Sequence, residues 1–347
     1  MNRLLVVLNI IFIALAFNSG YIDQEETLEE EQEEINVEDI DLSVKPNEMG
    51  KVMVLMLHSI GKEDGVWEIS KESFVKDLEY LLENNYYLVS LQDYIRGEMD
   101  VPAGKTPVVL TFDDGLKNNF KVIEEDGELI IDPDSAVGIM EEFKNNNPEF
   151  NSTATFYLFG TNPFRQKEHL DFKLNYLIEN GYDVGNHTYN HAFLNKIKTK
   201  EEILFQLGEQ VKFIKGVIPE YEVNTLSLPY GLRPEERLQE YLVRGKHGDV
   251  KYENIGILDV GSHPSYSWAD KRFNFKEIPR IRVSRTDEYQ ESEEWYEYFE
   301  KNHDLRYISD GVKDIITVPE VMVEYIDEEK TKNVEINIYN KEMLNND

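Results

Sequence analysis

The sequence contains no cysteine. This absence excludes disulfide bonds, metal sites built from thiolates, cysteine nucleophiles and a lipid-modified cysteine anchor. It does not by itself assign the protein to a compartment. Any chemistry in this chain must therefore use other side chains.

Basic residues are scarce, because the chain has 36 Lys and Arg against 68 Asp and Glu, giving a net charge of −32. Nucleic-acid binding requires basic side chains that neutralise phosphates, so this balance argues against a nucleic-acid partner. It suits a neutral or cationic substrate. With 41% hydrophobic and 12% aromatic residues over 347 positions, the composition predicts a globular protein with one large core and a small appendage.

The apolar segment 4–16 is shorter than the ~20 residues that cross a bilayer comfortably. It follows Arg3 and ends in a small-residue pattern at 14–16, which is the layout of a secretory signal. We expect residues 1–20 to be a signal peptide, or alternatively a membrane anchor, and the protein to be extracytoplasmic, either secreted or tethered at the cell envelope. The acidic residues 21–50 predict a disordered linker between this segment and the folded domain.

From Lys51 onward, strand-like and helix-like segments alternate, which predicts an α/β fold. Apolar runs predict strands at 52–57, 108–112, 155–159, 226–228 and 255–258. Apolar stripes predict helices after Ser70, within 136–143, over 170–178 and from Thr199, where Glu202 completes a capping box. Residues 117–151 are interpreted as an inserted loop with a helix, and residues 311–347 as a small β-rich extension.

Two adjacent carboxylates, Asp113 and Asp114, follow the apolar run 108–112. Paired carboxylates at the end of a buried strand repel each other unless a cation binds them. His187 and His191 are four residues apart, so they share one face of a helical turn and can bind the same ion. One Asp with two His leaves positions open for water and substrate, and the second Asp is then free to act as a base. This pattern predicts a metallohydrolase.

These motifs occur in a fixed order, and the series resembles the polysaccharide deacetylase family (carbohydrate esterase family 4, the NodB homology domain) over roughly residues 50 to 285. The motifs that carry the resemblance are Thr111-Phe112-Asp113-Asp114-Gly115, Ala154-Thr155-Phe156-Tyr157, Gly185-Asn186-His187-Thr188-x-x-His191 and Pro229-Tyr230-Gly231. The resemblance implies a distorted (β/α) barrel of the NodB type over residues 51–310. Pattern alone does not separate such a barrel from an open doubly wound sheet.

The resemblance also implies roles for individual residues. Asp114, His187 and His191 would bind one divalent metal ion, with zinc the best match to this set and cobalt, nickel or iron as alternatives. Asp113 would be the general base, and the backbone N–H of Tyr230 would stabilise the oxyanion.

The sequence departs from the family pattern where an arginine normally pairs with the catalytic Asp, because Ser227 occupies that position. Arg233, Arg280 and Arg282 are the candidates to replace its charge. Trp268 is a candidate wall of the acetyl pocket, with a place in the core as the alternative.

The late Leu-x-His motif that supplies the family's general acid also has no clear counterpart. His58, at the end of the first strand, is our first candidate for this acid and His263 the second.

Together these features predict an enzyme: a metal-dependent hydrolase that removes N-acetyl groups from an N-acetylglucosamine-containing cell-envelope polysaccharide, either peptidoglycan or an exopolysaccharide. The alternative is a catalytically weak carbohydrate-binding wall protein that retains the deacetylase fold. The same chemistry on a C–N bond outside sugars is a third reading, against which the secretion signal argues. The sequence indicates a polysaccharide as partner, with a membrane tether through the N-terminal segment, and no protein partner can be inferred from it.

Overall fold

The computed structural model describes residues 37–340. The predicted signal segment, residues 21–36 of the predicted linker and the last residues of the C-terminal extension lie outside this part. Among the residues that are described, no helix is both long and apolar enough to cross a membrane.

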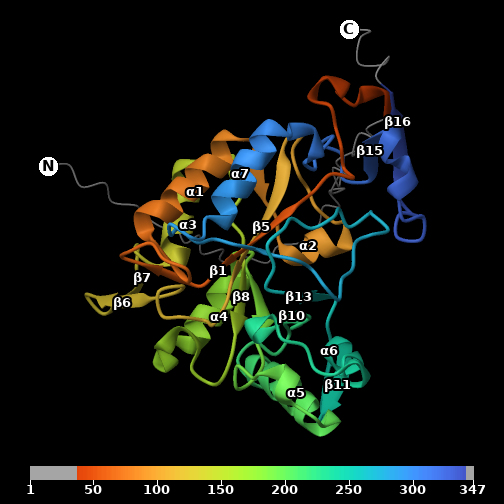
Figure 1. Cartoon of the computed structure of the whole chain (residues 1–347). Helices are drawn as coiled ribbons and strands as arrows, with labels where there is room; N and C mark the ends of the chain where they lie inside the picture. The colour runs from red at the N-terminus through yellow and green to blue at the C-terminus, as the bar shows by residue number, and fades with distance from the viewer. Residues whose placement is uncertain (1–36, 341–347) are drawn as a thin grey trace, which may run out of the picture. The chain divides into compact units, whose positions relative to one another are not determined.

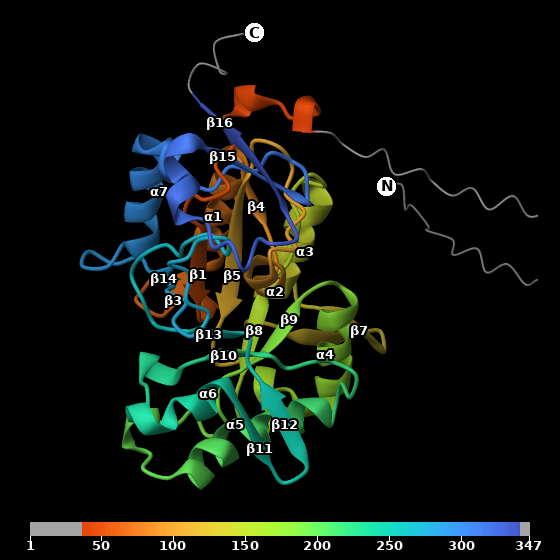
Figure 2. The ribbon, with the colours of Figure 1, turned by 90° about the vertical axis from the view of Figure 1, so that its right-hand side faces the viewer.

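An eight-stranded parallel sheet forms the centre of the fold (Figures 1 and 2). Its strands follow the order β13-β10-β9-β8-β5-β1-β14, and β4 also pairs with β5. Strands covered on both faces need near-continuous apolar runs, which is why the predicted strands are so apolar. The strands are β1 (Met53–Leu57), β4 (Tyr86–Leu88), β5 (Thr106–Phe112), β8 (Thr155–Leu158), β9 (Asp183–Asn186), β10 (Thr225–Ser227), β13 (Gly256–Leu258) and β14 (Ile281–Arg282).

The two edges of this sheet are linked by one segment of chain. Ile278 forms a parallel bridge with Leu258 of β13, and three residues later Ile281 pairs with Leu55 of β1. The sheet is therefore curled into a distorted barrel, as predicted, and the open doubly wound sheet is not formed. Arg280 lies within the closing segment and is fully buried.

In the described part of the chain, seven α-helices surround the sheet, and several begin at the residues predicted from the sequence. Ser70 caps α1 by accepting a hydrogen bond from the Ser73 N–H, and Thr199 caps α5 in the same way with Glu202. The helices are α1 (Lys71–Glu83), α2 (Leu91–Arg96), α3 (Ala136–Asn146), α4 (Leu170–Glu179), α5 (Lys200–Lys215), α6 (Glu240–Val243) and α7 (Glu291–Lys301).

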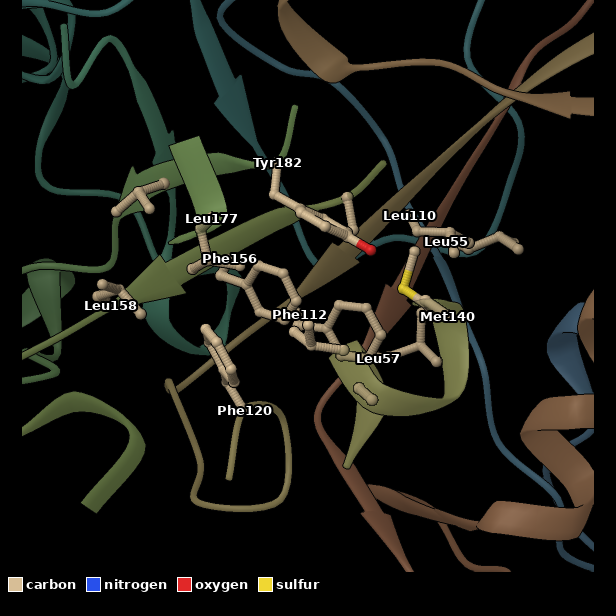
Figure 3. Close-up of a cluster of buried hydrophobic side chains, with 14 of the residues drawn as sticks. Leu55, Leu57, Leu110, Phe112, Phe120, Met140, Phe156, Leu158, Leu177 and Tyr182 are labelled. Carbon is tan, nitrogen blue, oxygen red and sulfur yellow. The ribbon is translucent and has the colours of Figure 1, made fainter. Parts of the chain in front are cut away.

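The main hydrophobic core lies between the strands and these helices (Figure 3). Phe112 of β5 and Phe156 of β8 stack with ring centroids 5.0 Å apart, and Leu57 of β1 lies in the same cluster. Burying each such side chain contributes about 1.5–3 kcal/mol. This core fixes the strand ends from which the polar motifs emerge.

Within residues 37–340, four two-stranded sheets complete the fold. The inserted segment forms a hairpin before α3, and the two apolar segments of the C-terminal extension pair in parallel. The pairs are β2 (Ser59–Gly61) with β3 (Glu68–Ser70), β6 (Val122–Glu125) with β7 (Glu128–Ile131), β11 (Arg244–His247) with β12 (Val250–Glu253), and β15 (Ile315–Pro319) with β16 (Glu335–Tyr339).

The sequence predicted that residues 37–50 belong to a disordered linker. In the structure the end of this segment, around Glu48 and Met49, is instead buried against the folded domain. Glu48 is only 3% exposed, and Met49 is buried in a second apolar cluster. The Glu48 carboxylate accepts hydrogen bonds from the Thr317 N–H (2.9 Å) and the Tyr307 hydroxyl (2.9 Å). The acidic composition of this segment predicted disorder. The prediction failed for Glu48 because its hydrogen-bond donors lie more than 250 residues further along the chain, where no local pattern reveals them.

Burial of Glu48, together with the nearby charge of Asp310, raises the pKa of the Glu48 carboxyl well above 4.5. The folded state therefore holds this proton at pH values where the unfolded state has lost it. Stability from this group is full below pH 4.5 and is lost as pH rises through the raised pKa. We expect Glu48→Gln to remove this loss, so that its melting temperature relative to the native chain rises as the pH increases above 4.5. A difference that stays constant with pH would contradict the prediction.

Candidate active site

The predicted site residues lie at the same end of the sheet. His58 directly follows β1, Asp113 and Asp114 follow β5, and His187 follows β9. Because all these strands are parallel, their carboxyl ends open on one mouth, where α/β barrels gather their chemistry.

Asp114, His187 and His191 converge on one point. Their potential ligand atoms all lie within 4.8 Å of one another. The Nε2 atoms of His187 and His191 lie 3.5 and 3.2 Å from Asp114 Oδ1. Asp114 and His191 both have positive φ, 72° and 50°, which non-glycine residues rarely adopt and which often marks a functional position.

Two observations test whether these residues fit a metal ion. Asp114 Oδ1 is buried, yet it accepts no hydrogen bond of good geometry. His187 Nδ1–H donates to the Ser227 carbonyl at 2.9 Å, so the lone pair of Nε2 points toward Asp114. Backbone-oriented imidazoles of this kind are typical of metal ligands. Two His and one Asp therefore fit a divalent cation, with positions left open.

The electrostatics of the three groups agree with this fit. Burial would raise the pKa of Asp114, but the neighbouring imidazoles of His187 and His191 hold it below its ordinary value. Burial would likewise lower the pKa of His187, but Asp113 and Asp114 raise it above its ordinary value. The site thus favours positive charge beside its carboxylates.

Asp113 is paired with Arg280, one of the three arginines considered from the sequence. The Arg280 guanidinium donates to Asp113 Oδ1 at 2.8 Å and to Oδ2 at 2.7 Å, and both residues are almost completely buried. Ser227 Oγ donates to Asp113 Oδ2 at 3.0 Å. Burial would raise the pKa of Asp113, but the guanidinium outweighs it and keeps the carboxyl ionised.

The other two arginines serve different partners. Arg233 donates to Asp259 at 2.7 Å, while Arg282 pairs with Glu291 and lies 4.7 Å over the ring of Trp67. The charge missing at Ser227 is therefore supplied by the segment that closes the barrel.

A cavity of about 600 Å³ opens over these groups. His58 lines it, and burial lowers the pKa of His58 although the nearby Asp113 and Asp114 charges oppose this shift. His263 is exposed and does not line the cavity. Trp268 is also absent from the lining, because it is buried in the second core cluster at 7% exposure.

Aromatic side chains flank the site, and two of them, Trp67 and Phe193, were not predicted from the sequence. Trp67, on the chain between β2 and β3, is 47% exposed and lines the cavity. Tyr230 is 51% exposed, and its ring stacks on Phe193 at 4.3 Å. The Tyr230 hydroxyl lies 3.0 Å from His191 Nδ1. The sequence signal for Trp67 was a single large aromatic residue in an otherwise polar, glycine-containing turn.

A family model described as polysaccharide deacetylase matches residues 133–244. This span includes His187, His191 and Tyr230 and begins after the Asp113–Asp114 pair. Two solved structures have a similar fold: a putative polysaccharide deacetylase from Bacillus anthracis (19% identity, TM-score 0.51) and a polysaccharide deacetylase from Bacillus cereus (20% identity, TM-score 0.50). Each alignment covers 68% of this chain and 66% of the other. No curated protein sequence matches.

The family match, the barrel and the ordered motifs agree. Residues 133–244 match the polysaccharide deacetylase family, and the fold of the chain is similar to that of the two solved polysaccharide deacetylases.

We predict that the protein binds about one divalent ion through Asp114, His187 and His191. Replacing both histidines by alanine removes two of three ligands, so metal content measured by elemental analysis should fall to background. His263→Ala, which changes an exposed histidine outside the cavity, is the matched control and should keep its metal. Full occupancy in the double variant would refute the ligand assignment.

Proposed function

We propose that this protein is a metal-dependent de-N-acetylase of an N-acetylglucosamine-containing cell-envelope polysaccharide, either peptidoglycan or an exopolysaccharide. The observation that carries the proposal is the convergence of Asp114, His187 and His191 beside the ionised, arginine-paired Asp113 within one open cavity.

Asp114, His187 and His191 would hold the metal ion, for which we propose zinc. When bound, the ion supplies a Lewis acid that polarises the acetyl carbonyl and activates water. Asp113 accepts the proton of the attacking water, and Arg280 keeps Asp113 ionised so that it is available for this step.

Two further residues complete the reaction. The backbone N–H of Tyr230 would donate to the developing oxyanion. Tyr230 has a positive φ of 59°, and its hydroxyl lies 3.0 Å from His191 Nδ1. The leaving amine must gain a proton, and His58 lines the same cavity. Burial lowers the pKa of His58, so the proton that Asp113 takes from the attacking water would pass to His58 before it reaches the leaving amine.

The surroundings of the site support a sugar polymer as substrate. Trp67 lies at the cavity, with Phe193 stacked beside the cavity residue Tyr230, and each is more than two-fifths exposed. Exposed aromatic rings offer flat apolar faces, which suit the apolar face of a pyranose ring. The predicted secretion segment supports a substrate outside the cytoplasm.

The proposal is tested by measuring acetate release from peptidoglycan, from an N-acetylglucosamine exopolysaccharide and from short chito-oligosaccharides. We expect release from at least one of these glycans, loss of release with a chelator, and recovery when a divalent ion is added back. Binding of a glycan without any acetate release would instead support the carbohydrate-binding alternative.

Asp113→Asn should retain the metal but lose most turnover, because the amide cannot accept a proton from water. Metal content and kcat should be measured on the same preparation. A near-normal rate would place the base elsewhere, and loss of metal would make Asp113 a ligand.

His58→Ala should lower kcat by about two orders of magnitude or more without loss of metal, as expected when a general acid is removed. His263→Ala is the matched control and should retain its rate. The reverse pattern would transfer the role to His263, and two unchanged rates would mean that neither histidine supplies the proton.

A further inference from the structure

A second large groove lies at the opposite end of the strands from the metal site. Asn224 and Ile255, which line it, directly precede β10 and β13, whereas Ser227 ends β10 and Asp259 follows β13 at the catalytic mouth. The groove has a volume of about 700 Å³. A molecule bound there would leave the catalytic cavity open.

The charge of this groove is opposite to that of the protein as a whole. Arg96, Lys215, Arg244, Lys246 and Lys251 line it, together with two glutamates. None of the five cations forms an ion pair within the described part of the chain. In a chain with nearly twice as many acidic as basic residues, this groove is a local excess of positive charge, with five cations against two glutamates in its lining. We call it the basic groove.

The β11–β12 hairpin adds an independent observation. Lys246 and Lys251 are direct cross-strand partners in its register, and Arg244 lies two residues from Lys246 on the same face. Like charges directly opposite each other in an antiparallel pair are destabilising. The hairpin therefore tolerates a repulsion that an anion lying between the two lysines would relieve.

We propose that the basic groove binds a linear polymer whose repeating units carry phosphodiester groups. A phosphodiester suits this site because its two non-bridging oxygens share one negative charge, so one group can accept a hydrogen bond from each of Lys246 and Lys251. Arg244 lies about 7 Å from Lys246 along the strand and faces Glu253, so the Lys246–Lys251 pair is the main contact for an anionic group and Arg244 is a second, partly balanced one. Val223 and Ile255 give the groove an apolar floor for the carbon backbone of the polymer. The groove would hold the protein on an anionic polymer while the metal site faces its own substrate.

The test uses the full chain and a fluorescently labelled glycerol-phosphate oligomer of defined length, with binding followed by anisotropy at low and raised salt. The native protein should bind it saturably, and raised salt should weaken the binding. Lys246→Glu with Lys251→Glu should weaken binding by about tenfold or more, because two contacts become repulsions. Metal content should stay unchanged, which would show that the fold is intact.

The matched control is Lys76→Glu with Lys167→Glu, which makes the same change in net charge at exposed lysines outside the groove. It should retain most of the binding. Equal losses in the two variants would overturn the proposal, because binding would then follow net charge alone. Equally tight binding of an oligogalacturonate of the same length would overturn the choice of phosphate.

A neutral variant checks the repulsion directly. Lys246→Gln should raise the melting temperature of the free protein, because it removes one of two facing charges. A lower melting temperature would mean that Lys246 stabilises the hairpin by itself, and the argument from repulsion would fail.

Discussion

The buried ion pair between Arg280 and Asp113 connects the fold to the chemistry. Both groups are removed from water, so each depends on the other: removing one partner of such a pair typically costs about 3–5 kcal/mol, because the remaining charge is left uncompensated. The guanidinium also donates to the carbonyl of Asp259 and to the hydroxyls of Thr111 and Ser227. It therefore ties together the ends of β5, β10 and β13 while it holds Asp113 ionised.

This pair depends on closure of the barrel. Arg280 lies between Ile278, which pairs with β13, and Ile281, which pairs with β1. Closing the two sheet edges with this short segment carries the guanidinium into the interior. In this chain closure of the barrel brings Asp113 and its counter-charge together, and the serine at position 227 contributes a hydrogen bond in place of a charge.

The two ends of the described chain are also held together by hydrogen bonds between distant residues. Glu48 reaches the backbone of β15, and the Tyr339 hydroxyl of β16 donates to the Pro46 carbonyl at 2.9 Å. The C-terminal strands and the segment before β1 are thus one packed unit, with Ile316 and Val318 in the same apolar cluster as Val52. The boundaries near residues 50 and 310 were predicted from changes in composition. The segments on either side of these boundaries pack together through contacts between residues that are distant in sequence.

The sequence by itself determined the α/β class, the main strands, the capped starts of α1 and α5, and the residues that can bind a metal ion. These features are local, because apolar runs, capping residues and closely spaced motifs carry their own signal within a few positions. Only the tertiary structure decided which arginine pairs with Asp113, that Trp67 rather than Trp268 lines the cavity, and that Glu48 belongs to the core. Each of these depends on segments that are distant in sequence: Arg280 lies 167 positions from Asp113, and Thr317 lies 269 positions from Glu48. No local sequence pattern predicts these long-range contacts, because they depend on the register of the strands and on the closure of the barrel.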